Sequence, residues 1–207
     1  MPPRREPVHG ITTVLIPVKA FHEAKLRLSS ALNATERANL ARRMAALVVS
    51  AAAPLPVTVV CDDLEVRRWA ESVGAAVVWR PGRGLNGAVS DGVERLARAG
   101  AGKVIVAHAD LPLASSLAWV ADFDGVTLVP DRHDDGTNVA CIPASAGFRF
   151  GYGPGSFGRH SAEAARLHLP LRIVRDPLLG WDVDLPADLD YDRAASAAAV
   201  ALERPCP

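Results

Sequence analysis

The segment Pro130–Arg159, with the letters PDRHDDGTNVACIPASAGFRFGYGPGSFGR, has residue types suited to holding a small anion. Gly136 stands before a Thr-Asn pair, and Gly151–Ser156 alternates glycine with Tyr, Pro and Ser. Glycine lets the backbone approach a ligand closely and turn its N–H groups toward it. A helix beginning near Ser156 would add the positive end of its dipole. These residues predict an anion-binding cradle.

Three cationic side chains follow the first apolar run of the chain. They are Lys19, Lys25 and Arg27. Lysine acts on phosphate as a point charge and arginine as a two-pronged donor, so the three together suit a polyphosphate. A solvated basic turn on the surface explains the same spacing. The spacing by itself leaves both interpretations open.

Three carboxylates stand at the ends of strand-like stretches. Asp110 follows a buried apolar run, and Asp182 and Asp184 are two residues apart, on one face of an extended stretch. Neighbouring carboxylates repel one another unless a cation holds them, and Mg²⁺ prefers one or two carboxylates plus phosphate oxygens. Asp110 predicts a magnesium ligand at a strand end, and the pair of Asp182 and Asp184 predicts a cation or a basic group between them. Alternatively, Asp110 caps a helix near Ala114, and Asp184 caps one that starts at Pro186.

A glycine-rich loop, GRGLNG at residues 82–87, leads into a helical stretch. It lacks the GxxxxGK[ST] spacing and is therefore not a P-loop. Gly84 and Gly87 would let a purine lie against the backbone, while Asn86 offers both a donor and an acceptor. A tight turn with an asparagine cap is the alternative.

Composition excludes several classes of protein. Lys+Arg and Asp+Glu both number 23 in 207 residues, and this balance argues against nucleic acid as the main ligand. The longest apolar run, Met44–Val60, is interrupted by Pro54 and Pro56, so it predicts no membrane span, and the N-terminus does not resemble a signal peptide. Three cysteines without a CxxC pair indicate a reduced, cytoplasmic protein.

Alternating apolar and amphipathic runs must position these loops. Strands are expected at Thr12–Val18, Val57–Cys61, Ala75–Trp79, Lys103–His108 and Val126–Val129. Helices are expected at Thr35–Ser50, with Thr35 as its cap, Leu64–Val73 and Asn86–Arg98. This alternation predicts an α/β fold with a mostly parallel sheet, helices on both faces and ligands at the carboxyl ends of the strands.

The later part of the chain predicts shorter elements. Strands are expected at Asn138–Ile142, Phe148–Phe150, Leu171–Val174 and Trp181–Val183, followed by a last helix from Pro186. No repeat or linker divides the chain, so residues 11–195 are expected to form one domain, with loose termini at 1–10 and 196–207.

Taken together, these motifs resemble one family. They are IPVK with AKLRL, GLNGA, HADLPL, PDRHDDGTN, FRFGYGPGSF and DVDLPADL, spread from Ile11 to Leu189. They are similar to the phosphoenolpyruvate or 2-phospho-L-lactate guanylyltransferases of coenzyme F420 biosynthesis. The resemblance implies a three-layer α/β/α Rossmann-like nucleotidyltransferase fold. The chain lacks the N-terminal GG…R…K signature of the sugar-phosphate and molybdopterin enzymes.

The resemblance implies that GTP and a three-carbon acid phosphate are joined with release of pyrophosphate. It assigns the acid phosphate to Thr137, Gly153 and Ser156, with Asn138 beside them. It further implies that Mg²⁺ binds Asp110, Asp182 and Asp184. The triphosphate would bind Lys19, Lys25 and Arg27, and these three residues together with Asp110 would be the catalytic residues. The nucleotide would bind Gly84, Asn86 and Gly87. A homodimer is a family-level expectation.

Other interpretations keep the fold and change the chemistry. A related nucleotidyltransferase would take another acceptor or base, such as 3-phospho-glycerate, molybdopterin or a sugar phosphate. A non-catalytic module would bind the nucleotide without releasing pyrophosphate. For the enzyme, no general base is required, because a phosphate monoester has a second pKa of about 6 and is already largely dianionic at neutral pH. Catalysis is then expected to be electrostatic and positional.

Overall fold

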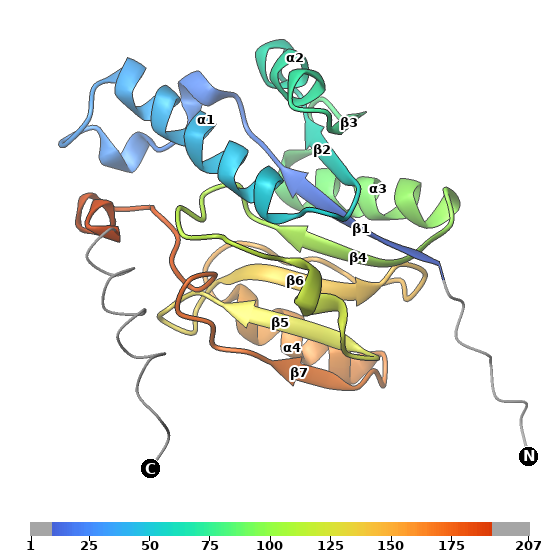
Figure 1. Cartoon of the computed structure of the whole chain (residues 1–207). Coiled ribbons are helices and arrows are strands. Elements are labelled where there is room, and N and C mark those ends of the chain that lie inside the picture. Colours follow the sequence, from blue (N-terminus) through green and yellow to red (C-terminus); the bar gives the residue numbers. More distant parts are fainter. Residues whose placement is uncertain (1–9, 192–207) are drawn as a thin grey trace, which may run out of the picture.

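The computed structural model describes residues 10–191 and has a seven-stranded sheet at its centre (Figure 1). The strand order is β3-β2-β1-β4-β6-β5-β7. The strands are β1 (Ile11–Pro17), β2 (Val57–Cys61), β3 (Ala76–Trp79), β4 (Ala101–Ala107), β5 (Val126–Pro130), β6 (Thr137–Pro143) and β7 (Leu171–Ile173). Only β6 runs antiparallel to its two neighbours, and every other strand pair is parallel. The predicted mostly parallel sheet is confirmed.

Helices cover both faces of the sheet, which gives three layers (Figure 1). They are α1 (Ala34–Ala51), α2 (Leu64–Ser72), α3 (Gly84–Arg98) and α4 (Ser156–Arg166), with 3-10 turns η1 (Phe21–Glu23), η2 (Leu26–Leu28), η3 (Ala118–Ala121) and η4 (Pro186–Leu189). Along β1, Val14 and Ile16 pack with α1 and α2, whereas Leu15 packs on the opposite face with α3. Because both faces are buried, the strands are continuously apolar.

The start of α1 differs from the prediction. Asn33, not Thr35, is the N-cap. Its Oδ1 accepts a hydrogen bond from the Glu36 N–H at 3.0 Å, and the Glu36 carboxylate accepts one from the Asn33 N–H at 2.7 Å. This reciprocal capping box satisfies two otherwise unpaired donors, so the helix begins one residue before Thr35.

Two predicted strands are absent from the described part of the chain. The segment 148–150 forms no strand, because side chains of α4 take the place of a neighbouring strand. The Arg149 N–H donates to Glu163 Oε1 at 2.9 Å, and the Gly151 N–H donates to His160 Nε2 at 3.0 Å. Phe148 and Phe150 are both buried in the same core cluster.

Residues 181–183 likewise form no strand, although the Val183 N–H donates to the Asp110 carbonyl at 3.2 Å. The predicted last helix is, within the described residues, the single turn η4. Asp184 does not cap it. Instead the Asp188 carboxylate accepts the N–H groups of Asp184 and Leu185. No helix follows Asp110 near Ala114 either, so neither Asp110 nor Asp184 caps a helix.

The predicted termini at 1–10 and 196–207 lie almost wholly outside the described residues, as does the end of the predicted domain at 192–195. Among the helices that the structure describes, none has the length and apolar character needed to cross a membrane.

The sheet has a topological switch between β1 and β4, its two central parallel strands. After β1, the chain continues to α1, which covers one face of the sheet. The helix that precedes β4 is α3, which covers the other face. In such sheets, ligands bind in the crevice at the carboxyl ends of the strands on either side of the switch. The loops that begin after Pro17 and Ala107 meet at that point.

A small apolar cluster holds the rim of this crevice together. Leu28 of η2 packs with Leu40 and Met44 of α1, and with Val183 near the C-terminal end of the described chain. The cluster therefore ties the loop after β1 to the segment that carries Asp182 and Asp184.

Candidate active site

Lys25 lies between two of the predicted aspartates. Its Nζ is 2.5 Å from Asp110 Oδ2 and 3.0 Å from Asp184 Oδ1, while Arg27 Nη1 is 3.7 Å from Asp184 Oδ2. Burial disfavours the ammonium, but the two carboxylates outweigh burial and raise the pKa of Lys25 above its ordinary value. Lys25, Arg27, Asp110 and Asp184 thus form one charged cluster.

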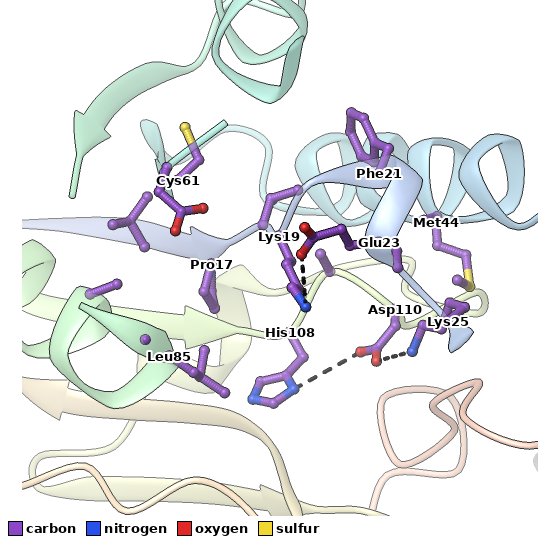
Figure 2. A pocket seen from close by; sticks show the side chains of 18 of the residues that line it. Pro17, Lys19, Phe21, Glu23, Lys25, Met44, Cys61, Leu85, His108 and Asp110 are labelled. Carbon is purple, nitrogen blue, oxygen red and sulfur yellow. Dashed lines mark hydrogen bonds and ion pairs between the residues drawn. The ribbon is translucent and has the colours of Figure 1, made fainter. Parts of the chain in front are cut away.

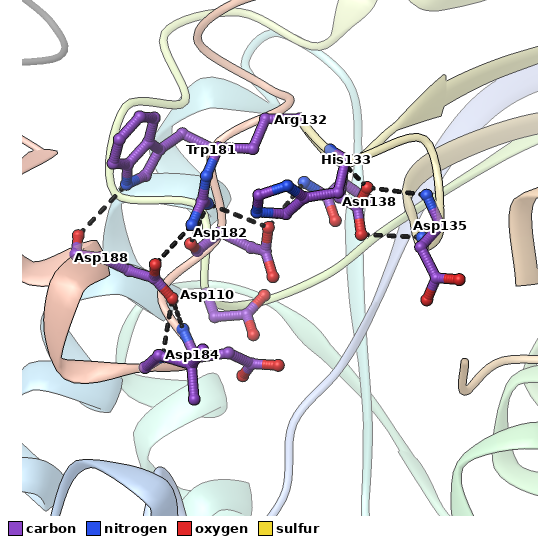
Figure 3. Close-up of polar contacts among 12 residues, drawn as sticks. Asp110, Arg132, His133, Asp135, Asn138, Trp181, Asp182, Asp184 and Asp188 are labelled. Carbon is purple, nitrogen blue, oxygen red and sulfur yellow. Dashed lines mark hydrogen bonds and ion pairs between the residues drawn. The ribbon is translucent and has the colours of Figure 1, made fainter. Parts of the chain in front are cut away.

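Asp182 belongs to the same acidic region (Figure 3). Its Oδ1 is 3.5 Å from Asn138 Nδ2 and 3.8 Å from Arg132 Nη1. Burial, together with the negative charges of Asp110 and Asp184, raises the pKa of Asp182 to about 6. The cations nearby therefore do not fully offset the three carboxylates.

Arg132 is held in place from two sides. Its guanidinium donates to the Asp188 carboxylate and lies 4.3 Å from the centre of the Trp181 ring (Figure 3). Asp188 is buried and also binds the N–H groups that begin η4. This network fixes the segment that presents Asp182 and Asp184.

The residues around Lys25 offer carboxylate oxygens to a hard divalent cation. Within residues 10–191, no three potential ligand side chains converge as a preformed metal site, and the Lys25 ammonium lies between Asp110 and Asp184. However, Asp110 Oδ1 is buried without a hydrogen-bond partner among the described residues. Carboxylate oxygens are the ligands that Mg²⁺ prefers, so Asp110 Oδ1 suits such an ion, although the described residues hold no preformed set of ligands.

The residues of the predicted anion cradle lie together at the start of α4, although the N–H groups of Gly155 and Phe157 already donate to Asp135. The Thr137 N–H donates to Ser156 Oγ at 3.0 Å, and both residues are 2% exposed. Gly153 and Gly155 have φ values of 113° and 73°, in the region that favours glycine, so the turn before Ser156 depends on them. Asn138 follows Thr137, and its side chain donates to the Leu179 carbonyl at 3.0 Å.

A cavity of about 390 Å³ opens beside the charged cluster (Figure 2). It runs across the ends of β1, β2 and β4 to the start of α3. Its lining includes Lys19, Lys25, Cys61, Gly84, Leu85 and Asp110. A mostly apolar cleft of this size with a few charged groups at one end is typical of a small-molecule site. Lys19 stands at its mouth, paired with Glu23 at 3.1 Å.

Two residues predicted to bind the nucleotide lie elsewhere. Asn86 and Gly87 do not line the cavity, although Gly84 does. Asn86 Oδ1 accepts the Tyr152 N–H at 2.7 Å, and its Nδ2 lies 3.5 Å from the Tyr152 carbonyl. Both polar atoms of Asn86 face Tyr152, so this residue holds the glycine turn against α3, while each amide atom keeps one further hydrogen-bonding position. A β-carbon on Gly87 would contact only the Arg83 side chain.

Sequence reasoning missed two histidines. His108 comes directly after β4 and lines the cavity, with its Nδ1 4.0 Å from Asp110 Oδ1 (Figure 2). His160 is buried in α4, with its Nδ1 3.0 Å from Thr137 Oγ1. The signal for His160 was available, because a spacing of four from Ser156 places both residues on one helix face.

Comparisons with known proteins show to which family the chain belongs. Residues 12–191 match the family model described as "Guanylyl transferase CofC like". The phosphoenolpyruvate guanylyltransferase of Sphaerobacter thermophilus is 35% identical over 188 residues, covering 86% of this chain and 91% of the relative. That of Rubrobacter xylanophilus is 35% identical over 184 residues, covering 84% and 90%.

Solved structures share the fold at low identity. A Desulfovibrio desulfuricans protein described as a nucleotide-diphospho-sugar transferase has a TM-score of 0.69 at 15% identity, covering 86% of this chain and 84% of its own. A 4-diphosphocytidyl-2C-methyl-D-erythritol synthase has a TM-score of 0.61 at 13% identity, covering 90% and 98%. The predicted three-layer nucleotidyltransferase fold is confirmed, and the chain belongs to the CofC-like guanylyl transferase family.

Proposed function

We propose that this enzyme joins the guanylyl group of GTP to phosphoenolpyruvate, or to 2-phospho-L-lactate, and releases pyrophosphate. The relatives at 35% identity carry the name phosphoenolpyruvate guanylyltransferase. The observation that best supports the proposal is one junction between two sites. Asn138 follows Thr137 of the cradle and places its side chain 3.5 Å from Asp182 of the acidic cluster, beside the cavity.

The two sites have complementary tasks. The cavity takes the nucleotide, with its phosphates toward Lys19, Lys25 and Arg27. The cradle around Thr137 and Ser156 takes the acid phosphate. Repulsion between the two anions is the main barrier to bringing them together, and cationic side chains with hydroxyl donors reduce it.

The chemistry is then a direct displacement. An oxygen of the acceptor phosphate forms a bond to the α-phosphorus of GTP, and the bond from that phosphorus to the bridging oxygen breaks to release pyrophosphate. The acceptor is already largely dianionic, so no residue needs to take a proton. A divalent cation at Asp110, Asp182 and Asp184 would supply charge neutralisation on the departing phosphates. Lys25, Lys19 and Arg27 hold the rest of that charge.

A substrate matrix tests the proposal. GTP, CTP and ATP are each incubated with phosphoenolpyruvate, 2-phospho-L-lactate, 3-phospho-glycerate and a sugar phosphate, in the presence of Mg²⁺. Pyrophosphate release and product mass are measured. We expect turnover with GTP and one of the two first acids. Turnover only with CTP and a sugar phosphate, or GTP binding without pyrophosphate release, would contradict it. The homodimer, the cytoplasmic location and the place in coenzyme F420 biosynthesis remain predictions.

A further inference from the structure

His160 joins the two walls of the anion cradle. Its ring is 0% exposed and projects from α4, four residues after Ser156. On one side, the Gly151 N–H donates to Nε2 at 3.0 Å. On the other side, Nδ1 lies 3.0 Å from Thr137 Oγ1. Both ring nitrogens therefore have a partner.

The Gly151 contact fixes where the ring hydrogen lies. A backbone N–H can only donate, so Nε2 accepts and carries no hydrogen. A neutral imidazole then has its hydrogen at Nδ1 and donates it to Thr137 Oγ1. Burial lowers the pKa of His160 to about 4, which agrees with a neutral ring near pH 7.

The hydroxyl groups of Thr137 and Ser156 each accept one hydrogen bond. Thr137 Oγ1 accepts from His160, and Ser156 Oγ accepts from the Thr137 N–H at 3.0 Å. A hydroxyl that has used one lone pair as an acceptor still has its hydrogen to donate. Both hydroxyls thus keep a hydrogen available for donation, and an anion requires donors.

Packing alone does not account for this arrangement. The ring centres of Phe150 and Tyr152 lie 6.0 and 4.8 Å from that of His160, so an aromatic or leucine side chain would fill the same space. Such a side chain would leave the Gly151 N–H without an acceptor and Thr137 Oγ1 free to turn. The two polar contacts require a histidine with a defined tautomer.

We propose that His160 is a positioning residue for the acceptor: its Nδ1–H holds Thr137 Oγ1 so that the threonine hydroxyl donates to the anionic group of the substrate. His160 itself does not touch the substrate. This inference rests on the proposed function, because it places the acid phosphate at Thr137 and Ser156.

Two isosteric variants separate the contacts of the ring. In His160→Asn, the amide nitrogen stands near the place of Nδ1 and still donates to Thr137, while Gly151 loses its acceptor. In His160→Gln, the amide oxygen stands near Nε2 and still accepts from Gly151, while Thr137 loses its donor. We expect His160→Gln to raise the KM for phosphoenolpyruvate about tenfold, the effect of one lost hydrogen bond, with the KM for GTP unchanged. His160→Asn should stay closer to the wild type.

A double-mutant cycle with Thr137→Val shows whether His160 acts through Thr137. If it does, His160→Gln adds nothing to the KM of a Thr137→Val enzyme. Ser161→Ala is the control on the same helix, since its hydroxyl donates to the Phe157 carbonyl, away from the cradle. An equal rise in both KM values, or multiplicative effects in the double variant, would overturn the proposal.

Long-range ¹H–¹⁵N NMR of the wild-type protein reads the tautomer without any turnover and without a variant that must fold. We expect the hydrogen at Nδ1; a hydrogen at Nε2 refutes the inference. Binding of phosphoenolpyruvate, measured by calorimetry, separates the two proposals. If the wild type releases no pyrophosphate but His160→Gln still weakens this binding about tenfold, the proposed function fails and the role of His160 stands.

Discussion

Lys25 is the residue on which the charge balance of the site depends. It is the buried cation between Asp110 and Asp184, and its pKa is raised by these carboxylates although burial acts against its charge. An ammonium in this position offsets carboxylates that would otherwise repel one another. The same ammonium lines the adjoining cavity, where it would meet the phosphates of the proposed nucleotide.

Asp110→Asn tests the central carboxylate. The amide keeps the shape of the side chain but loses the charge that pairs with Lys25 and suits a divalent cation. We expect kcat to fall about a hundredfold, roughly 3 kcal/mol of barrier, measured by pyrophosphate release. Asp124→Asn is the control, because Asp124 is 97% exposed and paired with Lys103. Full activity of the Asp110 variant would remove this carboxylate from the mechanism.

The raised pKa of Asp182 predicts a pH-dependent effect of this residue on the stability of the protein. This pKa is raised from 3.8 to about 6 in the folded protein. Above pH 6, the ionised carboxylate is therefore less favourable in the folded state than in the unfolded state. Asp182→Asn should therefore stabilise the metal-free protein at pH 7.5, by about 1–2 kcal/mol after allowing for partial exposure.

This advantage should shrink as the pH falls from 6 toward 4, because the folded wild type then takes up its proton before the unfolded chain does. Urea unfolding of both proteins at pH 7.5, 6.0 and 5.0 measures the difference, in which the contributions of other groups cancel. A stability difference that does not change with pH would exclude this explanation.

At the scale of elements, local hydrogen bonds decide where helices begin. The Asn33 cap of α1 satisfies the Glu36 N–H, while Thr35 lies inside the first turn. Asn33→Ala should lower the free energy of unfolding by about 1 kcal/mol. Thr35→Ala should change it by less than about 0.5 kcal/mol. Denaturant unfolding of the two variants compares them directly, and a larger loss for Thr35→Ala would reassign the cap.

Close packing of α3 against β1 leaves no room for a side chain at Gly92. A β-carbon at Gly92 would lie 2.7 Å from Leu15 Cδ2, in the core, whereas one at Gly158 of α4 would meet nothing within 4 Å. Gly92→Ala should destabilise the protein by about 1–3 kcal/mol, because overpacking outweighs the gain in helix propensity. Gly158→Ala should stabilise it by up to about 1 kcal/mol. Thermal unfolding of both variants checks the contrast, which equal shifts would contradict.

At the scale of the whole molecule, the charges are balanced overall but unevenly placed. Lys+Arg and Asp+Glu both total 23, yet three aspartates meet at one end of the sheet. A cation that binds only the folded protein stabilises it, by about 2.7 kcal/mol at a hundred times its Kd. Mg²⁺ should therefore raise the Tm by several degrees, about 2–4 °C for each kcal/mol.

Scanning calorimetry with Mg²⁺, and then with EDTA, measures this shift. The double variant Asp182→Asn/Asp184→Asn should lose most of it, since two of the three proposed ligands are gone. Asp124→Asn again serves as the control on a distant loop. An undiminished shift in the double variant would place the ion elsewhere.

The sequence by itself determined what depends on neighbours along the chain. Alternating apolar and amphipathic runs predicted the three layers, and β2, α2 and β5 lie within a residue of their predicted bounds. The glycine turns led to the hypothesis of an anion cradle, and strand-end positions placed the cationic loop and Asp110 at the same edge of the sheet, without the pairing of Lys25 and Asp110. These signals are local, because helix and strand periodicity and backbone freedom act over a few residues.

Only the tertiary structure decided how side chains are shared between distant segments. Lys25 is 85 residues from Asp110 and 159 from Asp184, so their pairing depends on the strand order and the path of the chain. Asn86 accepts a hydrogen bond from the Tyr152 N–H, and hydrogen bonds to α4 replace the predicted strand at 148–150. Each polar group has several partners within its chemical reach, and the packed fold alone selects one of them.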